Sequence, residues 1–384
     1  MMNDESLICE ETANFTLGNT FYRSQSKITR DLGVLAAKIY KSEQGRLRVL
    51  DAMTGCGVRS IRYYLESDAD FIWSNDSNPE NKAVIEYNLG FILQKNKGKI
   101  TYKNANNIFF ECFNNKDYYD FVDVDAFGSP NPYLSTVLWA TKINGLIYVT
   151  CTDGRTGTGH LPENCLQNYG SYGRSHPAAQ EQVLRLIIGS SLQEAATMGL
   201  GIEPIFAYFS GSTYRVMLRL LPKINLSLDN YGFLGYCHHC GEYTTISYKQ
   251  LGKVNCYHQQ ENKYYNYTIS GAMWLGNLHN KEYLKTMKNL AISLKWSTVS
   301  DLLSIMIHES NFPPYFYTLG EIGRRGKLDI PKRSQLIEAL ENDGFQATNT
   351  HINSQAIKTN ASLKQCIEIS EKLINNSKVG KIND

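Results

Sequence analysis

The sequence lacks several features that identify other classes of protein. No apolar run reaches the roughly 20 residues that a membrane helix requires, so a membrane protein is not expected. The first residues are acidic, with no basic segment followed by an apolar one, so no secretion signal is expected. The nine cysteines are an odd number without a compact framework, which indicates a reducing compartment with free thiols or metal ligands. A cytoplasmic location follows as an expectation.

The sequence also lacks a large excess of either positive or negative charge. The formal net charge of the 384 residues is only +2, which does not indicate a simple basic nucleic-acid binder. Residues 1–222 carry 21 Lys and Arg and 23 Asp and Glu, a net −2, whereas residues 223–384 carry 18 and 14, a net +4. A mildly basic C-terminal half suits contact with phosphates, and scattered solvated charge explains the same counts equally well.

The most informative run is F-V-D-V-D-A-F-G-S-P at residues 121–130. An apolar strand ends in Asp125, and Phe127 follows before a Gly-Ser-Pro turn. A carboxylate and an aromatic ring at such a strand end suit a flat base with an exocyclic amine, because the carboxylate accepts hydrogen bonds and the ring stacks. Asp123 points to the same side of an extended strand and is an alternative functional acid. A buried strand followed by a turn is the plainer interpretation.

A strand, a glycine turn and a helix lie upstream, in the order that cradles nucleotides. Residues 47–62 lead from an apolar strand through Asp51 and Gly55 into an amphipathic segment, without a G-x-G-x-x-G or Walker motif. A second apolar run ends in Asp76, which is placed either to bind ribose hydroxyls or to cap the following helix. A third strand within residues 99–107 ends in polar residues suited to an adenine edge.

These motifs, in this order, resemble the tRNA guanine-N2 dimethyltransferases of the Trm-one type, which use S-adenosyl-L-methionine. The resemblance rests on F-Y-R-S-Q-S-K-I-T-R-D-L at 21–32, D-A-M-T-G-C-G-V-R-S-I-R at 51–62, S-N-D at 74–76, V-D-V-D-A-F-G-S-P at 122–130 and V-T-C-T-D at 149–153. It continues more weakly through G-A-M-W-L-G at 271–276 and through 350–361, so it covers most of the chain.

The resemblance implies a role for each of several residues. Arg30 and Arg59 help to bind the cofactor, Asp76 takes its ribose, Asn104 and Ala105 border its adenine, Asp125 is the catalytic acid, and Phe21 and Phe127 flank the target guanine. Asp51 and Gly55 of the glycine turn complete the predicted cofactor site. The chain departs from the family at Ala126, where proline is usual, and at Asn104, where an acidic residue is common. The first change loosens the loop after Asp125, and the second removes a charge near the adenine.

The fold predicted from the pattern is α/β, a Rossmann-like class I methyltransferase domain followed by a smaller α+β domain. Strands are expected at 47–51, 69–75, 99–103, 119–124 and 145–151, and helices at 29–40, 58–66, 79–95, 130–141 and 177–199. Runs at 202–209 and 213–221 form an edge hairpin because their link is short. Residues 153–174 are expected to be a mobile loop. A boundary near residue 222 separates a catalytic domain, 1–222, from a tRNA-binding domain, 223–384.

The second domain contains two further patterns. Cys237, Cys240 and Cys256 have the spacing of a zinc ribbon, but Gln259 stands where the family has a fourth cysteine. His258 is a substitute ligand, and three buried apolar thiols without bound zinc are the expectation. Residues 313–361 predict a helix–turn–helix element with a hairpin. Its buried side would contain Leu319, Ile322, Leu336, Ile337 and Leu340, and its outward side Lys327, Lys332, Arg333, His351 and Lys358.

The predicted function is transfer of two methyl groups from S-adenosyl-L-methionine to N2 of a flipped-out guanine 26 in tRNA, with tRNA as the partner. Guanine 27 is left open as a second target. Two alternatives share parts of the pattern: another amino-methyltransferase, acting on DNA adenine or protein glutamine, and a non-catalytic RNA-binding protein on a methyltransferase scaffold. The first commonly carries Asn/Asp-Pro-Pro-Tyr/Phe where this chain has D-A-F-G, and the second does not need the intact set of Asp51, Asp76 and Asp125.

Overall fold

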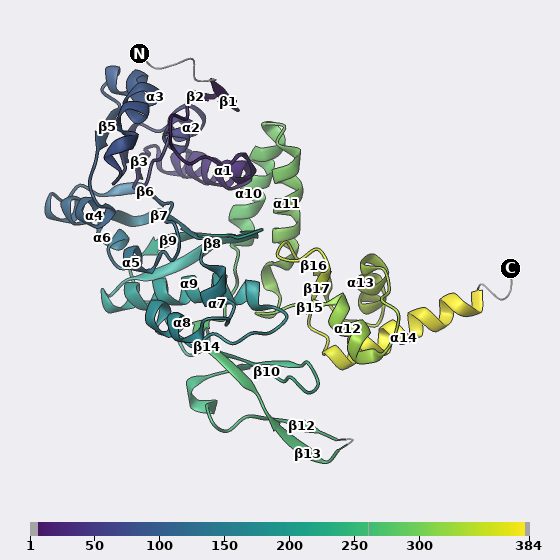
Figure 1. The fold of residues 1–384 in the computed structure, drawn as a ribbon. Coiled ribbons are helices and arrows are strands. Elements are labelled where there is room, and N and C mark those ends of the chain that lie inside the picture. The colour runs from purple at the N-terminus through teal and green to yellow at the C-terminus, as the bar shows by residue number, and fades with distance from the viewer. Residues whose placement is uncertain (1–6, 260, 381–384) are drawn as a thin grey trace.

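The computed structural model describes residues 7–259 and 261–380, and its centre is a seven-stranded sheet (Figure 1). The strands are β3 (Arg48–Asp51), β4 (Phe71–Asn75), β5 (Gly98–Thr101), β6 (Tyr119–Val124), β7 (Thr141–Cys151), β8 (Gly201–Ser210) and β9 (Thr213–Leu221). Their order is β5-β4-β3-β6-β7-β9-β8, parallel except for β9, which is antiparallel to both of its neighbours. The expected Rossmann-like methyltransferase sheet, closed by an edge hairpin, is confirmed.

The register of the sheet brings the acidic strand ends to one edge. Asp51 at the end of β3 lies opposite Ser74 of β4 and Asp123 of β6. The carboxyl ends of the three central strands are therefore level, and the loops that follow them open on the same side. In parallel sheets this edge is where ligands bind.

Helices cover both faces of the sheet (Figure 1). One face is packed by α1 (Lys27–Gln44), α10 (Lys281–Ser293) and α11 (Ser297–His308), and the other mainly by α4 (Ala105–Asn114), α6 (Val137–Ala140) and α9 (Ala179–Thr197). Near the first strands, α2 (Val58–Glu66) and α3 (Lys82–Gln94) share a small core with β1 (Ile8–Glu10) and β2 (Ala13–Phe15). Two 3-10 turns, Ser24–Ser26 and Pro79–Asn81, precede α1 and α3.

The part of the chain after β9 forms two small sheets, a hairpin and five helices within the described residues. A sheet of β10 (Tyr231–Tyr236), β11 (Tyr243–Ile246) and β14 (Thr268–Trp274) is followed along the chain by α10 and α11, and the hairpin of β12 (Asn255–His258) and β13 (Lys263–Asn266) projects from it. The C-terminal element contains β15 (Tyr317–Thr318), α12 (Leu319–Gly326), α13 (Arg333–Asn342), β16 (Ala347–Asn349), β17 (Ala356–Thr359) and α14 (Leu363–Gly380). Leu319, Ile322, Leu336 and Leu340 are buried in it, and Ile337 is partly buried.

Two sequence-based expectations differ from the structure. Residues 153–174 are not a loop throughout, because α7 (Gly154–Gly157) and α8 (Pro162–Tyr169) form there. A Cβ on Gly157 would lie 2.8 Å from the Val183 side chain of α9. Because glycine has no side chain, this glycine-rich segment can pack closely against α9. The helix expected at 130–141 consists of α5 (Asn131–Leu134) and α6, and β7 already begins at Thr141.

The helices α10 and α11 follow the expected boundary at residue 222 in the sequence, but they pack on the domain that precedes it. Both helices pack against α1, and the Tyr283 hydroxyl donates a hydrogen bond of 2.9 Å to the Ala36 carbonyl. Residues from beyond the boundary thus complete one face of the first sheet. Among the described residues, no helix combines the length and the apolar character that crossing a bilayer requires.

Candidate active site

A cavity of about 660 Å³ opens at the carboxyl edge of the central strands. The segment before α1, the glycine turn after β3 and the ends of β4 and β6 form its walls, and residues of β7 and β9 close its floor. Nine of the ten residues predicted from the sequence line this one cavity: Phe21, Arg30, Gly55, Arg59, Asp76, Asn104, Ala105, Asp125 and Phe127. Asp51 is the one that does not line it.

Asp76 fixes the shape of the turns at one end of the cavity. Its Oδ2 accepts a hydrogen bond of 2.8 Å from the Gly55 amide, and its Oδ1 accepts bonds of 2.9 and 3.2 Å from the Asn78 amide and the Asn81 side chain. Gly55 adopts φ of +59°, a conformation that side chains disfavour. Asp76 therefore holds the turn that precedes the 3-10 helix, whose N-cap is Asn78, and it also forms part of the cavity wall.

Asp51 lies beneath the glycine turn instead of in the cavity. Its side chain is fully buried, and its Oδ2 accepts a hydrogen bond of 2.7 Å from the Ser60 hydroxyl. Burial, together with the charge of nearby Asp123, raises the pKa of Asp51 to about 7. Asp51 thus supports the turn from below and does not line the cavity.

Asp125 is held by two arginines from different elements. Arg59 Nε of α2 lies 3.0 Å from Oδ2, and Arg215 Nη2 of β9 lies 2.8 Å from Oδ1. Burial by itself raises the pKa of Asp125, but the two guanidinium groups outweigh it and hold this pKa well below its ordinary value. The side chain is still 32% exposed, so lone pairs of an ionised carboxylate remain available to the cavity.

Asp123, the alternative acid, does not line the cavity. It is fully buried and accepts a hydrogen bond of 2.6 Å from the Tyr63 hydroxyl, with Arg59 Nη1 at 3.4 Å. Burial raises its pKa, so the carboxyl is pushed toward the neutral form. The geometry therefore favours Asp125 over Asp123 as the group that meets a substrate.

Two phenylalanines stand open at the mouth of the cavity. Phe21 is 77% exposed and Phe127 is 94% exposed, although both side chains are entirely apolar. Scattered exposed apolar residues are common, but two rings that share one cavity with a carboxylate form a place for a flat ring to stack. Phe127 follows Asp125 by two residues, so stacking and hydrogen bonding would act on the same bound group.

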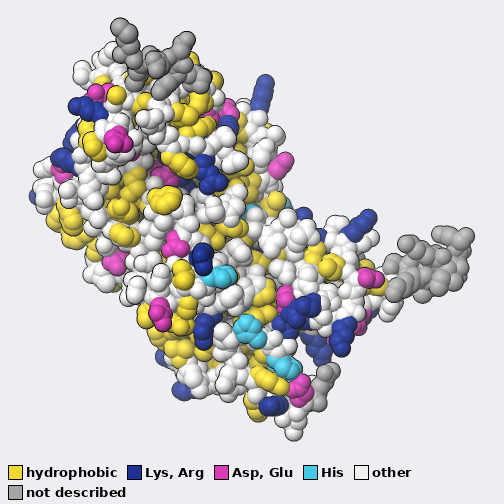
Figure 2. All heavy atoms as spheres, viewed as in Figure 1, with side chains coloured by type: hydrophobic (Ala, Val, Ile, Leu, Met, Phe, Trp, Pro, Cys, Tyr) yellow, Lys and Arg dark blue, Asp and Glu magenta, His cyan; other side chains and the backbone are white. Residues whose placement is uncertain are grey.

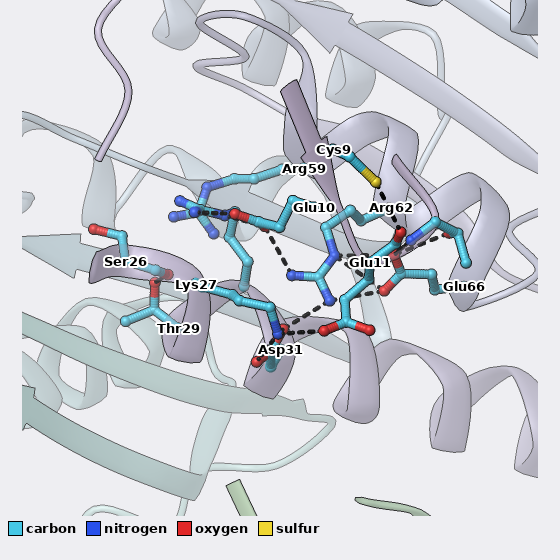
Figure 3. Close-up of polar contacts among 12 residues, drawn as sticks. Cys9, Glu10, Glu11, Ser26, Lys27, Thr29, Asp31, Arg59, Arg62 and Glu66 are labelled. Atoms are coloured by element: carbon cyan, nitrogen blue, oxygen red, sulfur yellow. Dashed lines mark hydrogen bonds and ion pairs between the residues drawn. The ribbon is translucent and has the colours of Figure 1, made fainter. Parts of the chain in front are cut away.

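Figure 3 shows a charge network around Glu10, Asp31 and Arg62. This network is buried, and it supports the cavity wall that contains Arg30. Arg30 Nε donates a hydrogen bond of 2.6 Å to Glu10 of β1. Arg62 of α2 is fully buried and forms ion pairs of 2.9 Å with Glu10, 2.7 Å with Asp31 and 2.8 Å with Glu66. The network joins β1, α1 and α2, and it fixes the position of Arg30 beside the cavity.

The sequence interpretation missed several residues of the floor. Arg215 of β9 and Thr150 of β7 line the cavity, and the Thr152 hydroxyl, just after β7, accepts a hydrogen bond of 2.7 Å from the Gly128 amide. The available signal for Arg215 was a cation inside an otherwise apolar strand, T-Y-R-V-M-L-R-L-L. A buried arginine needs a partner carboxylate, but the sequence does not show which one.

Two residues expected on an outward, RNA-facing side are buried, so that expectation was wrong. The Lys358 ammonium lies 2.7 Å from Glu181 of α9, and its side chain is 2% exposed. The His351 side chain is fully buried and donates from Nδ1 to Glu309. Both side chains instead attach the C-terminal element to the rest of the protein, whereas Lys327 and Lys332 do face outward.

A second group of polar side chains gathers away from the cavity. Cys237, Cys240, Cys256 and His258 each place one donor atom within 4.8 Å of the others. The expectation of no bound zinc depended on the lack of a fourth ligand at Gln259, and His258 supplies that fourth donor atom. The chemistry of the donor set, three thiols and one imidazole, fits zinc.

Comparison with known proteins agrees with the site. A family model described as N2,N2-dimethylguanosine tRNA methyltransferase matches residues 5–371. A tRNA (guanine(26)-N(2))-dimethyltransferase of Pyrococcus furiosus is 30% identical over 373 residues, 92% of each chain, and one of Saccharolobus solfataricus is 27% identical over 355 residues, 90% of this chain and 89% of the relative. The complex structure of Trm1 from Pyrococcus horikoshii with S-adenosyl-L-methionine superimposes with a TM-score of 0.82 at 27% identity, covering 95% of this chain and 99% of the other.

Proposed function

This chain belongs to the N2,N2-dimethylguanosine tRNA methyltransferase family, and we propose that the cavity between Phe21 and Asp125 is where it methylates guanine 26 of tRNA. The activity is that of an S-adenosyl-L-methionine-dependent tRNA guanine-N2 dimethyltransferase. The assignment of the site rests on one observation: nine residues predicted from the sequence line the same cavity. The roles given below to individual residues are part of this proposal.

The cofactor end of the cavity is the one formed by the glycine turn and the polar strand ends. Asp76 can accept from a ribose hydroxyl through Oδ2, because that oxygen accepts from the Gly55 amide alone, whereas Oδ1 already accepts from Asn78 and Asn81. Asn104 caps α4 by accepting from the Asn106 amide, and with Ala105 it forms an edge suited to adenine. When bound there, S-adenosyl-L-methionine supplies an activated methyl group on its sulfonium sulfur. Arg30 and Arg59 border the same space.

The guanine end of the cavity is formed by the exposed aromatic rings. A guanine stacked in a tRNA must be turned out of its stack to reach a cavity, which costs a few kcal/mol. Stacking against Phe21 and Phe127 offsets part of that cost, since each base–aromatic contact contributes about 1–3 kcal/mol. The same stacking aligns the base plane with the Asp125 carboxylate, which lies two residues before Phe127.

Asp125 acts as a hydrogen-bond acceptor for the guanine N2 amine. The lone pair on N2 is delocalised into the purine, and a hydrogen bond to a fixed carboxylate favours its localisation as positive charge develops. Because Arg59 and Arg215 hold the pKa of Asp125 low, this carboxylate is a poor final acceptor for the proton. The proton released from N2 therefore passes to water at the open mouth of the cavity. One N–H remains after the first methylation, so Asp125 keeps a donor to bind during the second.

The C-terminal element is the proposed contact for the tRNA body. Figure 2 shows Lys and Arg side chains gathered over this element, and Arg324, Lys327 and Lys332 lie on its surface. Exposed cations of this kind bind phosphates without reading sequence. Weaker binding with rising salt is the expected consequence.

The experiment that tests the function is a methylation assay followed by mass spectrometry of nucleosides. The protein is incubated with S-adenosyl-L-methionine and an unmodified tRNA transcript, and we expect N2-methylguanosine followed by N2,N2-dimethylguanosine at position 26. A transcript with adenine at position 26 is the control, and residual dimethylguanosine in it would reveal position 27 as a target. Methylation of DNA adenine or of protein glutamine instead, or cofactor binding without any transfer, would contradict the proposal.

A further inference from the structure

The β10–β11 turn and the β12–β13 hairpin bring four metal-ligating atoms together from two separate segments. Cys237 and Cys240 come from the turn, and Cys256 and His258 come from β12. Cys240 Sγ lies 3.5 Å from Cys256 Sγ, and His258 Nε2 lies 3.2 Å from Cys256 Sγ and 3.5 Å from Cys237 Sγ. No other part of the described chain holds three cysteines so close.

We infer that these atoms bind one Zn²⁺ and that His258 is its fourth ligand, in place of the cysteine that the family pattern has at position 259. Tetrahedral zinc has Zn–S distances of about 2.3 Å and Zn–N distances of about 2.0–2.1 Å, which set ligand atoms roughly 3.6–3.8 Å apart. The separations between these thiols and the imidazole are close to those values without any rearrangement of the backbone. The site is closed, since four protein donors leave no open position for a substrate.

The periodicity of β12 explains why the ligand is at 258 and not at 259. Side chains alternate along a strand, so Cys256 and His258 lie on the same face. β12 pairs with β13 through Cys256 opposite Tyr265 and His258 opposite Lys263, which continues this alternation to the end of the strand. The imidazole is longer than a thiol and reaches the metal position from within the strand. Gln259 stands one residue farther, on the alternate position, and offers no thiol.

The surroundings of His258 hold its ring in place. The rings of His239 and Tyr265 pack against it at centroid distances of 4.4 and 4.7 Å. His239 itself points Nε2 toward Glu261 at 3.1 Å, so its imidazole is engaged elsewhere. Of His238, His239 and His258, only His258 places a ring nitrogen among the three thiols.

The first pair of cysteines is also set in a turn that does not depend on the hairpin. The Gly241 amide donates a hydrogen bond of 2.7 Å to the Cys237 carbonyl, and Gly241 has φ of +87°. Arg325 of α12 donates to the carbonyls of His239 and His238 at 2.6 and 3.2 Å. A zinc ion at this place would therefore tie the β12–β13 hairpin to the C-terminal element that carries the exposed cations.

Two other interpretations of the cluster explain less. A disulfide between Cys240 and Cys256 would use two thiols and leave Cys237 and the imidazole nitrogen without a role. Three thiols buried as small apolar groups do not require a histidine nitrogen among them. The buried group of His279, Glu309 and His351 is different, because the Ala207 amide donates to His279 Nδ1 and His351 donates to Glu309. This group contains no thiol, and both of its imidazoles pair with the Glu309 carboxylate, so one zinc per chain is expected, not two.

The test is metal analysis of the full chain purified without chelator from cells supplied with zinc. We expect about one zinc per chain, and X-ray absorption at the zinc edge should show three sulfur ligands and one nitrogen ligand. Absence of zinc, a Cys240–Cys256 disulfide found by mass spectrometry, or a shell with four sulfurs or with an oxygen in place of the nitrogen would overturn the inference.

Variants separate a ligand role from a role in folding. His258→Ala should lose most of the metal, and His239→Ala, which removes a neighbouring ring that does not face the thiols, should keep it. His258→Cys should retain metal and give a four-sulfur spectrum after substitution with Co²⁺, even if His258→Ala proves unstable. Retention of full zinc content by a folded His258→Ala protein, or a His258→Cys protein that binds no metal, would contradict the assignment of His258.

Discussion

Arg215 Nη2 lies 2.8 Å from Oδ1 of Asp125, although the two residues are 90 positions apart in the sequence. Arg215 belongs to β9 of the edge hairpin, and Asp125 directly follows β6 at the edge of the sheet where the cavity opens. The pair places a guanidinium group beside the carboxylate, and both side chains line the cavity. Because Arg59 occupies the other oxygen, the orientation of Asp125 is fixed before any ligand binds.

The first prediction concerns Asp125 itself. Asp125→Ala should bind S-adenosyl-L-methionine with affinity near that of the wild type and lose methyl transfer by about 10²- to 10³-fold, because it removes the acceptor for the N2 amine and leaves the glycine turn intact. Asp123→Ala should reduce the rate less. Single-turnover methylation and calorimetry measure the two effects. An active Asp125→Ala enzyme together with an inactive, folded Asp123→Ala enzyme would reverse the assignment.

The second prediction concerns the pH dependence that Arg215 imposes. With both guanidinium groups present, the pKa of Asp125 is well below its ordinary value, so the carboxylate is ionised throughout the mildly acidic range. Arg215→Met removes one cation while burial remains, and burial raises the pKa. Activity of this variant should fall at acidic pH values where the wild type still works, and the Km for cofactor should change little. Arg215→Lys, which restores a charge, should recover part of the acidic activity. Superimposable pH profiles would sink the idea.

The third prediction concerns Asp76. Asp76→Ala should weaken cofactor binding by about 1.5–3 kcal/mol, because charge-assisted hydrogen bonds to ribose are lost together with the bond to the Gly55 amide. Asp76→Asn, which keeps an acceptor for that amide, should lose less. Arg30→Ala and Arg59→Ala should each show a comparable loss if both border the cofactor. Unchanged calorimetric affinity in all of these proteins would contradict the proposed cofactor end of the cavity.

The fourth prediction concerns the two exposed rings. Phe21→Ala and Phe127→Ala should each weaken productive tRNA binding by about 1–3 kcal/mol, since each removes one stacking surface. Both side chains are exposed in the free protein, so thermal stability should hardly change. Phe→Tyr at the same positions keeps the ring and should retain most activity. The comparison of kcat/KM for tRNA across these four variants tests the stacking role, and a large loss of stability would point instead to a role in folding.

The fifth prediction concerns stability at acidic pH. Burial lowers the pKa of His279 to about 4, whereas an unfolded histidine has a pKa near 6.5. Burial by itself raises the pKa of Glu309, but His351 and His279 outweigh it and hold this pKa well below its ordinary value. Below about pH 6.5 the unfolded chain binds a proton that folded His279 does not, and below about pH 4.5 the same holds for Glu309. Stability should therefore fall as the pH drops from about 6.5 to 4, by roughly 3 kcal/mol from His279 alone.

Urea unfolding at several pH values measures this loss. His279→Asn removes the titrating ring, so the slope of the unfolding free energy with pH should be smaller in this variant between about pH 6.5 and 4. Lys281→Ala, an exposed change two residues away, is the control and should keep the wild-type slope. Equal slopes in the wild type and His279→Asn would show that His279 is not the source.

The sequence by itself determined the catalytic scaffold and most of the candidate site. Its predicted strands lead into Asp51, Asp76 and Asp125, and the alternation of short apolar runs with helical segments favours a mostly parallel sheet in which those ends are level. β6 and α2 have the bounds that the pattern predicts, because each is marked by a local signal: a carboxylate or a glycine turn. Local signals of this kind depend only on residues that are adjacent in the sequence, so they can be identified without a structure.

Only the tertiary structure decided the partners of buried charges and the direction of individual side chains. Lys358 and His351 look like surface residues in the sequence. Both are buried in the structure, because Lys358 pairs with Glu181 and His351 pairs with Glu309, which are distant in the sequence. Arg215 meets Asp125, and His258 meets three cysteines, only because the sheet order and a hairpin place distant segments together. A buried charge needs a partner, but burial and partnership are properties of the packed chain, and no local pattern encodes them.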